Sequence, residues 1–277
     1  MRRVSRLYNH AWQSLFMGSR LERYRGLLAY LKEAGYNFHT MSEFACGVDR
    51  GETFPGRVCL LRNDIDSDPH GAAAMFACDH SMDVRATYFF RLSTLDVALA
   101  REIASSESEV GYHYEEIATV AKRLGLRSVQ QIDAHMELIR DEFRANFRRF
   151  AGLVGATPRI VASHGDFANR RIGIPNHYLL DARLMNDLGI LADAYDPRLH
   201  GSLEARFSDL PAPQWWHPGD PVLALHDKPA TVSILVHPRQ WTCNPALNFR
   251  LDAQRLGEEA IWRCRRGTAG PQNVPAS

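Results

Sequence analysis

The sequence predicts an α/β fold, a single barrel-like domain of about seven strand–helix units. Short apolar runs alternate along the chain with segments of helical periodicity, as in parallel βαβ units. No internal repeat and no linker-like stretch divides the 277 residues. Nearly every strand-like run in the middle of the chain ends in a residue able to bind a metal or transfer a proton. Since parallel strands share one carboxyl edge, we expect an active site there.

Composition favours a soluble cytoplasmic protein. The formal net charge of +1 gives no reason to expect nucleic acid or an anionic membrane as a partner. Residues 1–6 are basic but lack the apolar region of a secretory signal, and no run approaches the roughly 20 apolar residues of a membrane helix. The scattered cysteines show no C-x-x-C spacing, which is typical of reduced thiols: Cys46, Cys59, Cys78, Cys243 and Cys264.

The elements are expected in the following order. An extra N-terminal helix carries Tyr24, Leu27, Leu28 and Leu31 at helical spacing and stops at Gly35. Strands are expected at 59–61, 86–90, 109–113, 159–162, 190–194, 222–225 and 231–236. Helices are expected at 69–80, 128–153 and 252–265, the second opened by a Ser128–Gln131 capping box. We assign residues 20–266 to the barrel and 267–277, rich in Gly, Pro, Ala and Ser, to a disordered tail.

The first chemical motif is Arg62-Asn63-Asp64-Ile65-Asp66. Two carboxylates one residue apart, just past a strand end, can divide the work of binding a divalent cation and taking a proton from water. A plain turn before the next helix explains the same residues equally well. The motif therefore gains weight only with the other strand ends.

Three histidines end later strand-like runs: His113, His164 and His237. Each can also be explained without a catalytic or metal-binding role, as a packed side chain or as part of a strand-to-loop turn. Together with the two aspartates, however, they have the composition of a metal-assisted hydrolase site. We expect Arg91 or Arg62 to orient Asp64 through a charge-assisted hydrogen bond. The pair His226–Asp227 is expected to support the site or to lie in a loop, and Arg148–Arg149 to face solvent.

An aromatic pair, Trp215 and Trp216, lies in a Pro-rich segment. Such a pair can stack on a sugar ring, although tryptophans more often fill a core. We list it with the substrate-contact candidates, which are Arg62, Tyr114, Trp215 and Trp216.

The order of these motifs resembles the polysaccharide deacetylases, the NodB-homology proteins of carbohydrate esterase family 4. The resemblance runs from about residue 24 to 241, through R-N-D-I-D, A-T-Y-F-F-R, E-V-G-Y-H-Y-E, S-H-G and V-H-P, and is closest to a divergent branch with an R-H-D-V-D first motif. It implies a distorted (β/α) barrel of seven strands. It also implies metal-dependent removal of an N-acetyl group from a sugar.

By this resemblance, Asp64 is the base and Asp66 a metal ligand, although the two can exchange roles. His237 matches the family's general acid. In the family's H-[ST]-x-x-H motif only His113 is present, because Ile117 replaces the second histidine. We expect His164 as the third ligand, with Glu115 in reserve. Asn63 replaces the histidine of the divergent branch and cannot titrate.

The expected metal is Zn²⁺, given two histidine ligands, with Co²⁺, Mn²⁺ or Ni²⁺ as alternatives. The expected substrate is a small molecule or glycan, with a precursor of a surface polysaccharide as one candidate. Two other functions stay open: hydrolysis of another non-peptide amide, such as a ureide or cyclic imide, and glycan binding by an inactive homologue.

Overall fold

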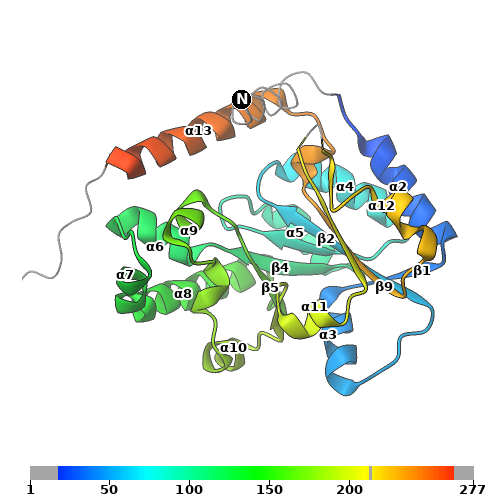
Figure 1. Cartoon of the computed structure of the whole chain (residues 1–277), viewed down its shortest axis with the longest axis horizontal. Coiled ribbons are helices and arrows are strands. Elements are labelled where there is room, and N and C mark those ends of the chain that lie inside the picture. Colours follow the sequence, from blue (N-terminus) through cyan, green and yellow to red (C-terminus); the bar gives the residue numbers. More distant parts are fainter. Residues whose placement is uncertain (1–17, 212–213, 265–277) are drawn as a thin grey trace, which may run out of the picture.

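A computed structural model describes residues 18–211 and 214–264 (Figure 1). Its strands are β1 (Tyr36–His39), β2 (Arg57–Ile65), β3 (Thr87–Phe90), β4 (Glu109–Tyr114), β5 (Ile160–Ser163), β6 (Ala192–Asp193), β7 (Ala205–Asp209), β8 (Trp216–His217) and β9 (Thr231–Val236). Its α-helices are α2 (Leu21–Glu33), α3 (Met41–Arg50), α4 (Pro69–Ser81), α5 (Val97–Ala104), α6 (Glu116–Leu124), α7 (Val129–Ala134), α8 (Met136–Val154), α9 (Phe167–Ile172), α10 (Ala182–Leu188), α11 (Pro197–Gly201), α12 (Pro221–Ala224) and α13 (Pro245–Cys264). Short 3₁₀ turns are η1 (Asn176–Leu179), η2 (Leu225–Asp227) and η3 (Pro238–Gln240).

The strands form one curled sheet in the order β6-β5-β4-β3-β2-β9-β7-β8, with β1 beside the first half of β2. Neighbouring strands are parallel except for β7 and β8. Within the described residues, β6 and β8 are the free edges, so the sheet closes only into a half-barrel. The α/β barrel predicted from the alternation of strands and helices is confirmed in this open form.

The two faces of the sheet are distinguished by the alternation of side chains along β2. Val58 and Leu60 point into the barrel, where they join a small apolar cluster with Phe89. Cys59 and Leu61 point outward into the large core beneath the helices. Because side chains alternate along a strand, Arg62 and Asp64 continue on the inner face. The register of β2 thus delivers the polar end of this strand to the barrel interior.

Most predicted elements are present. The N-terminal helix is α2, and its four apolar residues are buried, as predicted. The helix expected at 128–153 is interrupted at His135, which divides it into α7 and α8. Ser128 accepts a hydrogen bond from the Gln131 amide, but the Gln131 side chain accepts from the Arg127 amide, so only half of the capping box forms.

The strand predicted at 222–225 is wrong, and so is the predicted start of the last helix. Residues 222–225 form α12 and the start of η2 instead of a strand, because Pro221 favours a first helical turn and Asp220 caps it by accepting from the Val222 amide. Helix α13 begins at Pro245, well before the predicted 252. The predicted tail at 267–277 lies outside the described residues.

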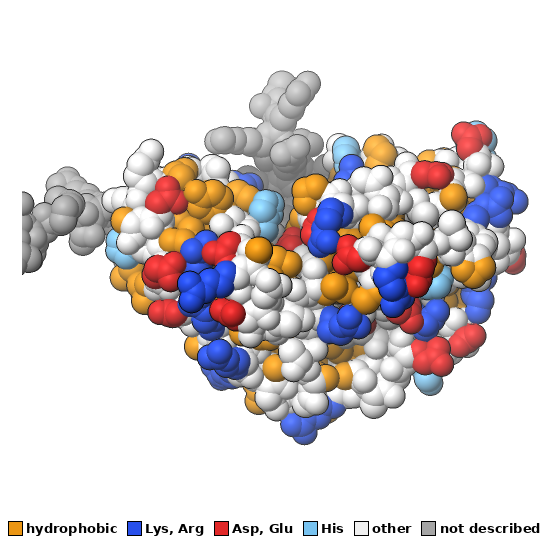
Figure 2. Space-filling model, turned by 90° about the horizontal axis from the view of Figure 1, so that it is seen from below, with side chains coloured by type: hydrophobic (Ala, Val, Ile, Leu, Met, Phe, Trp, Pro, Cys, Tyr) orange, Lys and Arg blue, Asp and Glu red, His pale blue; other side chains and the backbone are white. Residues whose placement is uncertain are grey.

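The surface carries no large region of one sign of charge on the face shown in Figure 2, where Lys and Arg side chains alternate with Asp and Glu. This mixture agrees with the formal net charge of +1. All five cysteines are free thiols. Among the described helices, none is both long and apolar enough to span a bilayer.

A buried carboxyl group on α4 gives a testable pH dependence of stability. Tyr24 donates a hydrogen bond of 2.7 Å to Asp79, and Tyr88 donates to its other oxygen. Burial raises the pKa of Asp79 to about 7. The folded state therefore holds this proton more tightly than the unfolded state, and stability falls as pH rises between the unfolded pKa of about 4 and pH 7.

We expect Asp79→Asn to flatten the pH dependence of the free energy of unfolding across this window. Urea denaturation at a series of pH values measures it. The exposed Asp83→Asn, a few residues away, is the matched control and should keep the wild-type slope. An unchanged slope in Asp79→Asn would contradict the assignment.

Candidate active site

The carboxyl ends of the parallel strands meet at one edge of the half-barrel, and polar residues follow there. Asp66 comes directly after β2, His164 directly after β5 and His237 directly after β9. His113 is the next-to-last residue of β4. The parallel sheet thus brings four residues that are far apart in sequence to one edge. This is where a parallel sheet is expected to carry its active site.

Three of them form a compact cluster of donor atoms. One ligand atom from each of Asp66, His113 and His164 lies within 4.8 Å of the other two. Asp66 Oδ1 lies 2.9 Å from His113 Nε2 and 3.6 Å from His164 Nε2. Burial alone would raise the pKa of Asp66, but His164 and His113 hold that pKa well below its usual value. An anionic carboxylate facing two imidazoles is a donor set that suits a divalent transition metal.

The far nitrogens of both imidazoles face oxygen atoms of the protein. His113 Nδ1 lies 2.9 Å from the Ala162 carbonyl oxygen and can donate to it, which leaves Nε2 directed at Asp66. His164 Nδ1 lies 3.2 Å from Glu115 Oε2, within ion-pair distance but without hydrogen-bond geometry. Outer contacts to a carbonyl and a carboxylate are typical of metal-binding histidines, because they fix the ring and its tautomer. The residues present therefore fit a metal.

Glu115 is itself fixed by Arg91, whose Nη2 lies 2.7 and 2.8 Å from the two carboxylate oxygens. Burial alone would raise the pKa of Glu115, but His164 and Arg91 lower it to about 2. Arg91 also donates to the Asp66 main-chain oxygen at 3.1 Å. Of the two arginines expected to orient Asp64, Arg91 does not do so, because its guanidinium is occupied by Glu115.

Arg62 orients Asp64 instead. Its Nε and Nη2 each donate to one carboxylate oxygen at 2.7 Å, and both side chains are almost fully buried. Burial alone would raise the pKa of Asp64, but Arg62 and then His113 lower it. Asp64 Oδ2 lies 3.6 Å from His113 Nε2, so this carboxylate borders the donor cluster without belonging to it.

A close approach between strands helps to place His113. A Cβ atom at Gly111, two residues earlier on the same inner face, would overlap the Phe89 ring and lie 2.8 Å from the Ile160 carbonyl oxygen. Only glycine fits between β3 and β5 at this point. The tight packing fixes the part of β4 that carries the histidine.

His237 is held by a carboxylate that the sequence analysis missed. Its Nδ1 lies 2.6 Å from Asp209 Oδ1, and its main-chain amide donates to Asp209 Oδ2 at 2.8 Å. Burial alone would lower the pKa of His237, but Asp209 above all raises it to about 10. His237 is therefore a cation at neutral pH. Its Nε2 points to the cluster, 3.9 Å from Asp66 Oδ2.

The same strand-end rule would have found Asp209, because it is the last residue of β7. The run A-R-F-S-D alternates polar and apolar residues and lacks the long apolar stretch that marks β2 or β9. No strand was predicted there, so its last residue was overlooked.

We expect Asp209→Asn to lower the pKa of His237, because the neutral amide no longer stabilises the imidazolium. Nuclear magnetic resonance titration of the imidazole measures this directly. Asp227→Asn is the control, since it removes a carboxylate 2.9 Å from His226 in an exposed pair far from the site. An Asp209→Asn protein in which His237 titrates as in wild type would contradict the role given to Asp209.

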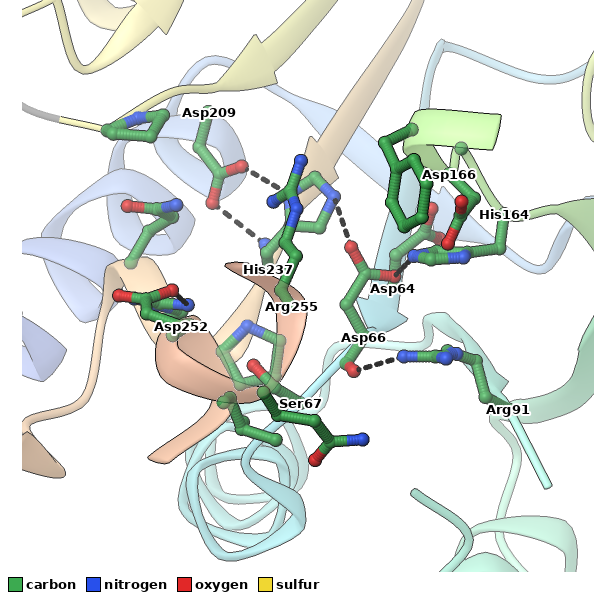
Figure 3. Close-up of a pocket in the computed structure, with 18 of the residues that line it drawn as sticks. Asp64, Asp66, Ser67, Arg91, His164, Asp166, Asp209, His237, Asp252 and Arg255 are labelled. Atoms are coloured by element: carbon green, nitrogen blue, oxygen red, sulfur yellow. Dashed lines mark hydrogen bonds and ion pairs between the residues drawn. The ribbon is translucent and has the colours of Figure 1, made fainter. Parts of the chain in front are cut away.

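These groups open onto one pocket of about 410 Å³ (Figure 3). Its floor contains Asp64, Asp66, His164 and His237, and Figure 3 shows Asp66 between His237 on one side and Arg91 on the other. Helix α13 supplies a wall, with Asp252, Arg255 and Glu258. The pocket is large enough for part of a sugar or a similar polar molecule.

No family model and no curated protein matches the sequence. Polysaccharide deacetylases are, however, among the solved structures that are similar to this chain. One such enzyme, from Bacillus cereus, is 13% identical and has a TM-score of 0.39, over 74% of this chain and 89% of its own. IcaB from Ammonifex degensii is 15% identical with a TM-score of 0.43, over 61% of this chain and 72% of its own. A CE4 family pseudoenzyme from Bacillus anthracis is 13% identical with a TM-score of 0.40, over 76% of this chain and 63% of its own.

At such identities and TM-scores, the similarity concerns only the general arrangement of the chain. Statements on chemistry have to come from the residues of the site.

The candidates for substrate contact are not supported by the structure. Tyr114 is fully buried on the helix side of the sheet, where its hydroxyl donates to Asp193 at 2.8 Å. Arg62 is 4% exposed and is occupied by Asp64. Trp216 is buried against Trp241, and Trp215 packs on the core beneath Arg20. None of the four lines the pocket.

The other expectations turn out as follows. His226 and Asp227 pair with each other in an exposed turn, which confirms the loop alternative. Arg148 and Arg149 are exposed on α8, as predicted. Asn63 is fully buried, and neither of its amide atoms has a hydrogen-bond partner among the described residues. Its side chain points outward to the helices, by the alternation along β2, and takes no part in the site.

Proposed function

We propose that this protein is a metal-dependent hydrolase that removes the acetyl group from an N-acetylated sugar. The observation that carries the proposal is the cluster of Asp66, His113 and His164, flanked by a buried anionic Asp64 and a protonated His237 at the floor of one pocket. This set contains a metal site, a base and an acid, the parts that amide hydrolysis requires. The motifs that resemble the polysaccharide deacetylases support a sugar as the substrate.

Asp66, His113 and His164 would hold the metal. A divalent cation there supplies a Lewis acid that polarises the amide carbonyl and makes nearby water more acidic. We assign Zn²⁺ from the two imidazoles and one carboxylate, and Co²⁺, Mn²⁺ and Ni²⁺ suit the same donors.

The chain's own groups move the protons. Asp64 remains ionised, and Arg62 fixes its two oxygens so that Oδ2 faces the donor cluster. From there it takes the proton of the attacking water. His237, charged and held by Asp209, presents Nε2 to the pocket and gives its proton to the departing amine. Base and acid thus both border the donor cluster, and each is oriented by a buried partner of opposite charge.

Metal content tests the proposal. We expect the wild-type protein to bind about one equivalent of metal, and Asp66→Ala and His113→Ala to lose it because each removes one of three protein ligands. Elemental analysis after incubation with Zn²⁺, Co²⁺ or Mn²⁺ measures the content. Glu258→Gln, which changes a carboxylate of the same pocket outside the cluster, should keep the metal.

Two results would change the conclusion. Absence of metal from the wild-type protein under all these conditions would favour a glycan-binding homologue without activity. Bound metal with release of ammonia instead of acetate would favour another non-peptide amide as the substrate.

A further inference from the structure

Two arginines beside the active-site pocket have no carboxylate partner among residues 18–211 and 214–264. Arg255 extends from α13 over the pocket of Figure 3. Arg170, on α9, lines a neighbouring pocket of about 360 Å³. The two pockets share His164, Gly165 and Asp166, so they adjoin at a metal-binding candidate, and we call the region where they meet the opening.

The acids at this opening are bonded to other cations. Lys122 lies 2.9 Å from Asp166 and 3.5 Å from Glu258. Arg239 lies 2.7 Å from Asp252. Further out on α13, Glu259 is bonded to Arg171 and Arg263. These ion pairs leave the charges of Arg170 and Arg255 without a close counterion in the described chain.

The two guanidinium groups also act on each other. Burial and then the charge of Arg255 lower the pKa of Arg170, and Asp166 and Glu259 offset this only in part. Two cations that repel across one opening are stabilised by an anion placed between them. Arginine suits phosphate and carboxylate in particular, because its fork of N–H donors matches two oxygens of either group.

We propose that Arg170 and Arg255 bind an anionic group on the substrate, and that the enzyme prefers a negatively charged N-acetylated sugar to a neutral one. The proposal rests on the proposed function, because it identifies a substrate class for the same site. The anionic group lies beside the metal cluster and not on it, since Arg170 lines only the neighbouring pocket and Arg255 belongs to the α13 wall of the first. Phosphate and carboxylate share the chemistry, and the experiment distinguishes them.

Binding to the metal-loaded full-length protein tests the proposal by titration calorimetry. The probes are N-acetylglucosamine, N-acetylglucosamine 1-phosphate and the carboxylate-bearing N-acetylmuramic acid. Wild type should bind at least one anionic probe about tenfold more tightly than the neutral sugar, and added salt should reduce this preference. The double variant Arg170→Gln/Arg255→Gln should bind all three probes alike.

Arg250→Gln is the matched control, because it removes one positive charge from an exposed position of α13 that lines neither pocket. It should retain the wild-type preference. Equal affinity of wild type for neutral and anionic probes would overturn the proposal, and so would an unchanged preference in the double variant. If both anionic probes bind, the ratio of their dissociation constants shows whether the site favours phosphate or carboxylate.

Acetate release is measured separately, so the two proposals fail separately. A charge preference that depends on Arg170 and Arg255, without acetate release from any probe, would retain the anion site and count against the deacetylase. Acetate release without a charge preference would support the deacetylase and count against the anion site.

Discussion

Asp64→Asn is expected to slow turnover severely and leave the metal bound. An amide cannot take a proton from water, and loss of a general base reduces the rate by about 10²- to 10⁴-fold. The donor atoms of Asp66, His113 and His164 are untouched, because Asp64 borders their cluster without belonging to it. Acetate release and metal content, measured on the same preparation, check both parts of the expectation.

The matched variant is Asp66→Asn, two residues further along the same motif. It should lose both metal and activity, since the neutral amide is a poor ligand for a divalent transition metal. Comparison of the two variants therefore separates base from ligand. If Asp64→Asn loses the metal and Asp66→Asn retains it, the roles are exchanged, which is the alternative that the sequence left open.

Much of the site follows from local sequence, for a clear physical reason. In a parallel sheet, the end of each buried strand fixes the edge at which the next residue emerges. Asp66, His113, His164 and His237 were therefore found without knowledge of the strand order. The same alternation that points His113 into the barrel points Tyr114 outward, so the wrong assignment of Tyr114 was avoidable.

Other features depend on contacts between distant segments. Which arginine holds Asp64 is decided by the packing of Arg62 between the rings of Phe89 and Tyr195, and by the capture of Arg91 by Glu115. Neither contact has a signature in the local sequence. The wall supplied by α13 was missed for the same reason. Its helical pattern was recognised, but nothing in the sequence placed it across the pocket.

Asn63 shows a third kind of difference. Its side chain is buried without a hydrogen-bond partner among the described residues, although unsatisfied buried amides are unfavourable. The alternation along β2 predicts that it faces the helices. It does not predict the missing partner, for which the structure offers no explanation.

The ion pair of Arg62 and Asp64 should be as important for stability as for catalysis. Removal of one partner leaves an uncompensated charge in the barrel interior, because both side chains are almost fully buried. We expect Arg62→Met to lower the free energy of unfolding by about 3–5 kcal/mol. Urea denaturation at neutral pH measures the change.

Two further variants make this expectation specific. In Arg62→Met/Asp64→Leu no charge is left unpaired, so most of the lost stability should return even though activity does not. Arg198→Met breaks the surface ion pairs of a half-exposed arginine with Asp196 and Asp49 and should cost no more than about 1 kcal/mol. If the double variant were as unstable as Arg62→Met, the loss would come from packing against Phe89 and Tyr195 and not from the buried charge.

The pH dependence gives an independent check with a definite sign. In wild type the pKa of Asp64 is lowered, so its contribution to stability is present above the unfolded pKa of about 4 and is lost as pH falls below it. Without Arg62 the burial of Asp64 dominates and raises that pKa instead. Arg62→Met should therefore gain stability relative to wild type as pH is lowered from neutral toward 4, because protonation removes the unpaired charge. A deficit that stays constant over this range would show that Asp64 is not the ionised group on which the proposed base depends.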